Sequence, residues 1–484
     1  MTLSSRMSPA EMRKELGHPV VDNDGHFCEI PEQIAEYVEE VSSPAVADRY
    51  LKWINQFFLA QVGKGYPKTL KERLDNWSGA SSFWGYTVNT YDRATAFFPR
   101  LYAERMEELG FDYCVAYPSL GLFSNRIEGD DELRVAACRA TNLYSREMFK
   151  DVERLMTPVA IIPMHTPQEA LAELEFTARN NKSKAVVLTS GSRREIPRIK
   201  REFPNVSQLV QRIDFYGIDS QYDYDPVWAK LAELKLPISF HGQTVGTWSG
   251  PISPTSNTFC RLAPPGHTYP ALALALLLGG VTSRFPTLKF QFAELGVGWM
   301  KAIWKSVYEL WSKRGINMQN NNPANLDIDK MLELGEKYAS PRTKKHMHAG
   351  LNFLRQGLVE PEIVNEFAKI NVSSKAELAE HFSSRFYAGC EADDPGVAWA
   401  LRENPGRAKL RTTFGSDVGH WDVSDAREVL PETYELVEKG WINIDELKDF
   451  VFTNAAKLYT DIQPDFFKGT SLEKSVWDHL KRVD

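Results

Sequence analysis

The chain has 484 residues, of which 43% are hydrophobic and 25% are charged, and this is enough material for a large buried core. A net charge of −7 and a pI of about 5.9 give no general case for binding nucleic acid or an anionic membrane. Five cysteines without a CxxC pair predict free thiols, residues 1–14 lack an apolar signal-peptide core, and no apolar run could span a bilayer, so we expect a cytoplasmic protein.

The first strand carries the most informative stretch of the chain. Residues 1–18 are predicted to be a lead-in, and the strand begins at residue 19. Asp22, Asp24 and His26 follow at every second position, where a strand would place them in one row on one face. Such a buried row suits a divalent metal, because isolated buried charges are costly. The alternative is a polar turn in which Asp22 and Asp24 cap the next helix.

Strand-like and helix-like segments alternate along the rest of the chain. Residues 31–100 are rich in aromatic side chains and are predicted to be an insertion packed over one end of the main domain. From residue 101 onward, periodicity predicts strands at 111–117, 158–162, 184–188, 236–240, 288–292, 385–389 and 410–414. It predicts helices at 102–109, 131–155, 167–179, 225–234, 269–278, 297–313, 395–403 and 426–459.

This alternation predicts parallel strands and an α/β fold, a distorted (β/α)₈ TIM barrel with aromatic-rich and helical insertions. The alternative is an open doubly wound sheet. The absence of a GxGxxG motif after the first strand argues against this alternative. We expect one barrel domain over 19–461, with insertions at about 31–100 and 314–380, and a tail at 462–484. In the second insertion His346 and His348 lie two apart on a predicted helix, so we expect them to face different directions.

Barrel enzymes carry their chemistry at the carboxyl ends of the strands, and this chain places polar side chains there repeatedly. Because these ends meet at one mouth, seven residues are predicted metal ligands: Asp24, His26, Glu29, His241, Glu294, Asp417 and His420. Asp22 and His165 are predicted to support them, with a turn as the alternative for His165. Glu391 is predicted to bind the substrate or to cap a helix, and Trp248 to wall the pocket or to pack on the surface.

Five motifs support a family resemblance: Asp22-x-Asp24-x-His26-x-x-Glu29, His241-Gly, Glu294-x-Gly-x-Gly-Trp299, Gly415-Ser-Asp417 with His420-Trp421, and Asn454-Ala-Ala-x-Leu-Tyr459. Together they resemble the amidohydrolase superfamily, in the branch that includes aminocarboxymuconate semialdehyde decarboxylase. The resemblance implies that Asp24, His26, His241 and Asp417 bind a divalent metal beside a small-molecule substrate. It also implies that Asp417 moves protons, and we predict that His420 is catalytic with it.

Two departures from the branch pattern bear on the reaction. Its decarboxylases usually have His-x-His or Glu-x-His in strand one and a histidine after strand six, where this chain has Asp24-x-His26 and Glu294. One zinc needs about four ligands, so seven carboxylate-rich donors predict two metals per chain, iron with iron, manganese or zinc.

A similarity to the larger, metal-bearing subunit of a hydroxylase in this branch implies a dinuclear non-heme oxygenase acting on a small organic or amino acid. Such an enzyme would need O₂, an electron donor, and an oligomer with a smaller paralogous subunit. The alternatives are a mononuclear hydrolase or decarboxylase with one zinc, and a catalytically silent scaffold subunit.

Overall fold

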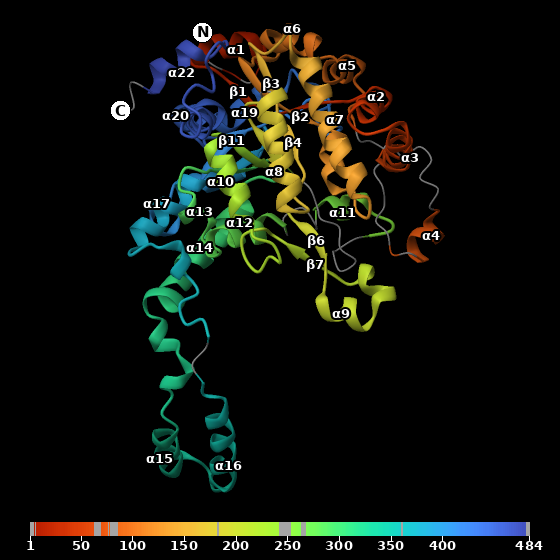
Figure 1. Cartoon of the computed structure of the whole chain (residues 1–484). Coiled ribbons are helices and arrows are strands. Elements are labelled where there is room, and N and C mark those ends of the chain that lie inside the picture. Colours follow the sequence, from red (N-terminus) through yellow and green to blue (C-terminus); the bar gives the residue numbers. More distant parts are fainter. Residues whose placement is uncertain are drawn as a thin grey trace.

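The computed structural model describes residues 4, 6–61, 69–75, 77, 86–181, 183–241, 253–262, 268–359 and 362–480. In this part of the chain, parallel strands form the interior and most helices lie outside them (Figure 1). The strands are β1 (Val21–Phe27), β2 (Tyr113–Pro118), β3 (Met156–Pro158), β4 (Ala160–Ile162), β5 (Val186–Leu188), β6 (Ser192–Glu195), β7 (Gln211–Asp214), β8 (Ile238–Phe240), β9 (Phe290–Phe292), β10 (Phe386–Cys390) and β11 (Arg411–Phe414).

Two parallel sheets together close the barrel. One sheet has the order β1-β2-β3, and the other has the order β11-β10-β9-β8-β5-β4. They join at Val159, whose amide donates to Ala116 on β2, while the next amide, of Ala160, donates to Ala185 beside β5. On the other side, the Asp417 amide after β11 donates to the Asp24 carbonyl on β1, at 2.9 Å. The predicted distorted (β/α)₈ barrel is therefore confirmed.

Most of the helices lie outside the strands, and several end close to the predicted positions. They are α1 (Pro9–Leu16), α2 (Pro31–Val41), α3 (Pro44–Gln61), α4 (Leu70–Asp75), α5 (Thr90–Phe97), α6 (Pro99–Leu109), α7 (Asp131–Phe149), α8 (Pro167–Phe176), α9 (Pro197–Glu202), α10 (Asp225–Glu233), α11 (Asn257–Leu262), α12 (Thr268–Leu278), α13 (Val281–Arg284), α14 (Gly298–Trp311), α15 (Ile328–Tyr338), α16 (Pro341–Gly357), α17 (Lys375–Arg385), α18 (Gly396–Leu401), α19 (Val429–Glu438), α20 (Ile444–Lys448), α21 (Asn454–Thr460) and α22 (Glu473–Leu480). None of the described helices is both long and apolar enough to cross a membrane.

Two local predictions were wrong, and one pair of strands was not predicted. The helix predicted over 131–155 ends at Phe149, and the following residues turn into β3. The single strand predicted at 158–162 is two strands, because the chain changes partner at Val159. The antiparallel pair of β6 and β7 was not predicted. Its residues are mostly charged or polar, and the paired residues are 16 to 22 positions apart in the sequence, so local periodicity does not reveal the pairing.

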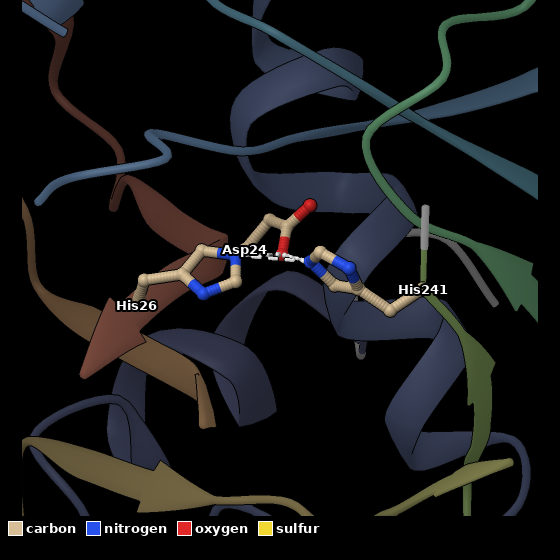
Figure 2. A group of neighbouring side chains, drawn as sticks. All are labelled: Asp24, His26 and His241. Atoms are coloured by element: carbon tan, nitrogen blue, oxygen red, sulfur yellow. Dashed lines mark hydrogen bonds and ion pairs between the residues drawn. The ribbon is translucent and has the colours of Figure 1, made fainter. Parts of the chain in front are cut away.

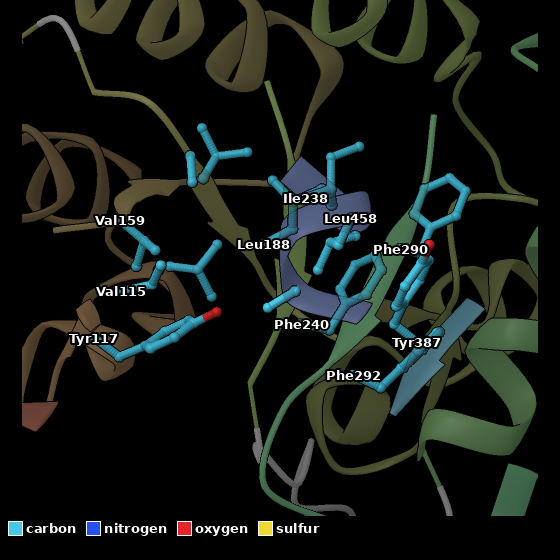
Figure 3. Close-up of a cluster of buried hydrophobic side chains, with 14 of the residues drawn as sticks. Val115, Tyr117, Val159, Leu188, Ile238, Phe240, Phe290, Phe292, Tyr387 and Leu458 are labelled. Carbon is cyan, nitrogen blue, oxygen red and sulfur yellow. The ribbon is translucent and has the colours of Figure 1, made fainter. Parts of the chain in front are cut away.

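A continuous apolar core fills the barrel and the space between strands and helices (Figure 3). Val115 on β2, Leu188 on β5 and Phe240 on β8 are buried in it, as are Phe290 and Phe292 on β9. Each fully buried side chain of this size contributes about 1.5–3 kcal/mol by leaving water. The core therefore fixes the strands, and with them the positions of the residues at their ends.

Candidate metal centre

Side chains from β1, from the end of β8 and from the loop after β11 meet at the carboxyl end of the barrel. Figure 2 shows His26 and His241 approaching the Asp24 carboxylate from opposite sides. The two Nε2 atoms lie 2.9 Å apart, and Asp24 Oδ1 lies 3.1 Å from His241 Nε2 and 3.7 Å from His26 Nε2. Asp417 Oδ1 lies 3.3 Å from His26 Nε2. Asp24, His26 and His241 therefore form one compact group of donors, Asp417 adjoins it through His26, and all four residues are buried.

These separations suit a metal ion. Four donors placed tetrahedrally at 2.0–2.1 Å from zinc lie about 3.3–3.4 Å from one another. The distances here, from 2.9 to 3.7 Å, bracket that value. Two imidazole nitrogens 2.9 Å apart repel unless a proton or a cation lies between them. Both oxygens of Asp417 are also buried without a well-formed hydrogen bond, which a metal would satisfy. The residues fit a divalent metal.

The β1 strand carries a register shift between Asp22 and Gly25, and this shift separates the predicted row of side chains. Asp24 and His26 join the donor group. The Asp22 carboxylate instead accepts hydrogen bonds from the Ser416 amide and hydroxyl, at 2.9 and 2.7 Å, and from the Tyr102 hydroxyl at 3.0 Å. The prediction that all three side chains share one face was therefore wrong, because an irregular strand does not keep a period of two.

A second group of three donors shares His26 with the first. His26, Asp417 and His420 each bring a ligand atom within 4.8 Å of the others. His420 Nδ1 lies 2.7 Å from Asp417 Oδ1, and the His420 ring lies 3.9 Å from the His26 ring. Glu294, after β9, lies 3.6 Å from His241 Nδ1 through Oε2. These residues extend the donor set beyond one metal position.

Burial and the neighbouring charges set the protonation of the group. Burial, with His420 and His241 nearby, lowers the pKa of His26 well below its usual range, so this ring is neutral and free to donate a lone pair. Burial acts against the charged form of His241, but Asp24 and Glu294 outweigh it and raise its pKa. Burial, reinforced by Asp422 and Glu294, raises the pKa of Asp417 well above its usual range. Burial and the neighbouring carboxylates therefore disfavour the charged form of Asp417, and a bound cation would offset this effect.

Other predicted site residues lie apart from the donor atoms. Glu29 was predicted as a ligand, but both of its oxygens accept backbone amides, from Leu120 at 2.9 Å and Gly121 at 2.6 Å, so it anchors the loop after β2. His165 makes no hydrogen bond through either ring nitrogen, and burial beside Arg134 and Arg194 lowers its pKa to about 3. It does not join the donor group in the described residues.

The two predicted substrate contacts have different outcomes. Burial, with Asp422 and Glu294 next in effect, raises the pKa of Glu391 to about 8, so the charges of these carboxylates influence one another. Asp394, three residues later in the same turn, accepts a hydrogen bond from the Gly396 amide at the start of α18, at 2.7 Å. The capping role that was predicted as an alternative for Glu391 therefore belongs to Asp394. Trp248 lies outside the described residues.

Ser119 is a site residue that the sequence did not reveal. Its hydroxyl lies 3.3 Å from His26 Nδ1 and 3.4 Å from His420 Nε2, so it bridges the two rings. It follows β2 directly, and its place at a strand end was the only available signal. Arg126 was missed too. It lies near enough to Glu294 and His241 for the charges to influence one another, and burial lowers its pKa to about 9.

Comparison with known protein families gives one match, to the family described as amidohydrolase, over residues 44–315. The chain belongs to the amidohydrolase family. The matched span is more than half of the chain and includes His241 and Glu294, whereas Asp24, His26 and Asp417 lie outside it. Comparison with curated protein sequences gives no match.

Solved amidohydrolase-like structures share the fold over almost the whole chain. A crystal structure of an amidohydrolase from Mycobacterium avium subsp. paratuberculosis K-10 matches with a TM-score of 0.51 at 15% identity, covering 91% of this chain and 99% of the other. A 5-carboxyvanillate decarboxylase from Sphingomonas paucimobilis matches with a TM-score of 0.50 at 11% identity, covering 91% and 98%. At these identities the likeness concerns the fold alone.

Proposed function

We propose that this chain is a metal-dependent enzyme that decarboxylates or hydrolyses a small organic acid. In this proposal Asp24, His26, His241 and Asp417 hold one divalent metal, zinc or manganese. The observation that carries the proposal is the group of Asp24, His26 and His241 donor atoms, 2.9–3.7 Å apart, with Asp417 Oδ1 lying 3.3 Å from the shared His26 Nε2. A bound metal would supply a Lewis acid for a substrate oxygen or lower the pKa of a bound water.

Residues of this chain would position the substrate and handle protons around that metal. The Asp417–His420 pair, 2.7 Å apart, is suited to hold a proton between Asp417 Oδ1 and His420 Nδ1 and to transfer it during the reaction. Arg126 places a cation near Glu294, where an acid group of the substrate would bind. Glu391, whose carboxyl is influenced by the charge of Glu294, would contact a donor group of the substrate, such as a hydroxyl or an amine.

The comparisons favour bond cleavage over oxygenation as the leading reaction. One fold neighbour is a decarboxylase and the other is an amidohydrolase. Decarboxylation and hydrolysis need only one metal and a proton carrier, and the pair of Asp417 and His420 supplies the second. We therefore place the cleavage reaction before the oxygenase that the carboxylate-rich donor set predicts.

The second donor group supports a second candidate, a dinuclear oxygenase. His26, Asp417 and His420 form a further set of three, and Glu294 approaches the other nitrogen of His241 at 3.6 Å. Two metals, iron with iron, manganese or zinc, would bind here. The sequence resemblance to the larger subunit of 2-aminoisobutyrate hydroxylase belongs with this candidate. It would require O₂, an electron donor and a smaller paralogous subunit.

Metal content and reaction products separate the two candidates. We expect about one divalent metal per chain by elemental mass spectrometry, and CO₂ or hydrolysis product without O₂ uptake from a panel of small organic acids. We expect His241→Ala to weaken metal binding at least about 100-fold, because it removes one of four ligands. His165→Ala, at a neighbouring strand end but outside the donor group, should retain the metal.

Other outcomes of these measurements would favour a different function or refute the assignment of the ligands. About two metals including iron, together with O₂ consumption, would favour the oxygenase. If no metal binds after loading with zinc, manganese or iron, both candidates fail and a silent scaffold subunit remains. If His165→Ala loses the metal as His241→Ala does, the assignment of the ligands is wrong.

A further inference from the structure

The segment between α14 and α17 leaves the barrel and ends in a helical hairpin, which stands away from the rest of the molecule in Figure 1. The hairpin consists of α15 (Ile328–Tyr338) and α16 (Pro341–Gly357), joined by a short turn. Within it only Ile328 and Met347 are buried. Two short helices bury too little surface to stabilise each other, so this arm hairpin needs a further surface to pack against.

One face of the arm hairpin carries charged side chains that form ion pairs with one another. Arg355 pairs with Asp329 at 2.6 Å, and Glu336 lies 3.4 Å from His348 and 3.6 Å from Lys344. These ion pairs cross from one helix to the other and cover the same side of the hairpin. Exposed pairs of this kind are worth little in energy, yet they mark the side that faces water.

The other face is mainly apolar, and its large side chains are exposed. At 100° per residue, the exposed side chains of α15 fall on one stripe and those of α16 fall on a second stripe on the same side of the hairpin. These residues form what we name the apolar arm face: Met331, Leu334, Tyr338, Phe353 and Leu354. Tyr338 is 72% exposed and Phe353 is 75% exposed. Gly350 lies between them with no atom within 4 Å of its Cβ position, so another helix could approach closely there.

We propose that the apolar arm face binds the same face of a second copy of this chain, as a two-fold hairpin-on-hairpin contact. All five side chains of the face are apolar or aromatic, and the Lys337 ammonium lies 5.0 Å from the Tyr338 ring centroid. The complementary surface must therefore be mainly apolar, and an identical face meets this requirement. Each aromatic side chain buries about 150–250 Å² when covered, so the five residues offer on the order of 500 Å² per copy. A symmetric pair would bury about 1,000 Å², which reaches the size of a specific interface.

The proposal is independent of the metal centre, and one pair of neighbouring substitutions tests it. Phe353→Asp places a charge on the apolar arm face. Asn352→Asp places the same charge one residue earlier, toward the ion-paired face, and serves as the matched control. In sedimentation velocity over about 1–100 µM, we expect the wild type and Asn352→Asp to dimerise and Phe353→Asp to stay monomeric. Circular dichroism and metal content should be the same in all three.

A second measurement keeps the test decisive if Phe353→Asp does not fold. In the wild type, hydrogen exchange over residues 328–357 should slow as the protein concentration rises through the dimerisation range. A wild type that stays monomeric would overturn the proposal and would leave a different protein as the occupant of the apolar arm face. A dimer that Phe353→Asp leaves intact, with exchange over 328–357 independent of concentration, would overturn it as well.

Discussion

Gly415, directly after β11, limits where the Asp24 carboxylate can lie. A Cβ atom on residue 415 would lie 2.6 Å from the Asp24 Cβ atom, although carbon atoms normally approach only to about 3.5–4.0 Å. Both atoms are fixed close to the backbone, so neither can turn away. Gly415→Ala must therefore displace either Asp24 or the loop that carries Asp417. Overpacking of this kind costs about 1–3 kcal/mol of unfolding free energy.

The displacement should be measurable as a loss of metal affinity. We expect Gly415→Ala to weaken metal binding about 10–100-fold, as for other changes that move a ligand without removing it. A competition titration against a metal indicator measures the affinity, and thermal unfolding of the metal-free protein measures stability. The control is Gly298→Ala at the first residue of α14, where a Cβ meets no atom within 4 Å. Wild-type affinity in Gly415→Ala would refute the argument that Asp24 must stay in place.

Two further predictions concern buried glutamates. Glu29→Gln replaces one of the two carboxyl oxygens that accept backbone amides with an NH₂ group, so we expect denaturant unfolding to show a loss of about 1–3 kcal/mol, with metal content unchanged by elemental analysis. Burial, partly offset by Arg139, raises the pKa of Glu173 from 4.5 to about 7, so the folded state keeps a proton there that the unfolded chain loses. Stability should fall as the pH rises across this window, and Glu173→Gln should reduce that slope, by at most about 1.4 kcal/mol per pH unit, in unfolding curves from pH 4.5 to 8. An unchanged slope would contradict the assignment.

The fold and the main donor set were predictable because both follow from simple periodic patterns. Short apolar strands alternating with amphipathic helices predict a parallel barrel, and the barrel brings the carboxyl ends of its strands together. His241 and Asp417 are 176 positions apart in the chain, yet His241 directly follows β8 and Asp417 is the third residue after β11. Sequence reasoning could therefore place them beside Asp24 and His26 without knowing how the loops run.

What the sequence could not predict depends on pairing between strands. Glu29 looks like a ligand because it follows His26 by three residues, but the loop after β2 brings two amides to it. Ser119 carries no motif and gains its position only when β2 pairs beside β1. The change of partner at Val159 likewise depends on β2 and β5 together. Local periodicity contains none of this information.

The register shift in β1 gives the Asp-x-Asp-x-His motif two separate tasks. Asp24 and His26 lie in the donor group that we propose binds a metal, while Asp22 accepts hydrogen bonds from the amide and hydroxyl of Ser416. Ser416 precedes Asp417, which is held at a positive φ of 51° that few residues other than glycine adopt. The bond from the Asp417 amide to the Asp24 carbonyl completes the connection. The β1 strand therefore supplies two of the proposed metal ligands and positions a third, Asp417. A substitution at Asp22 would be expected to weaken metal binding by displacing Asp417.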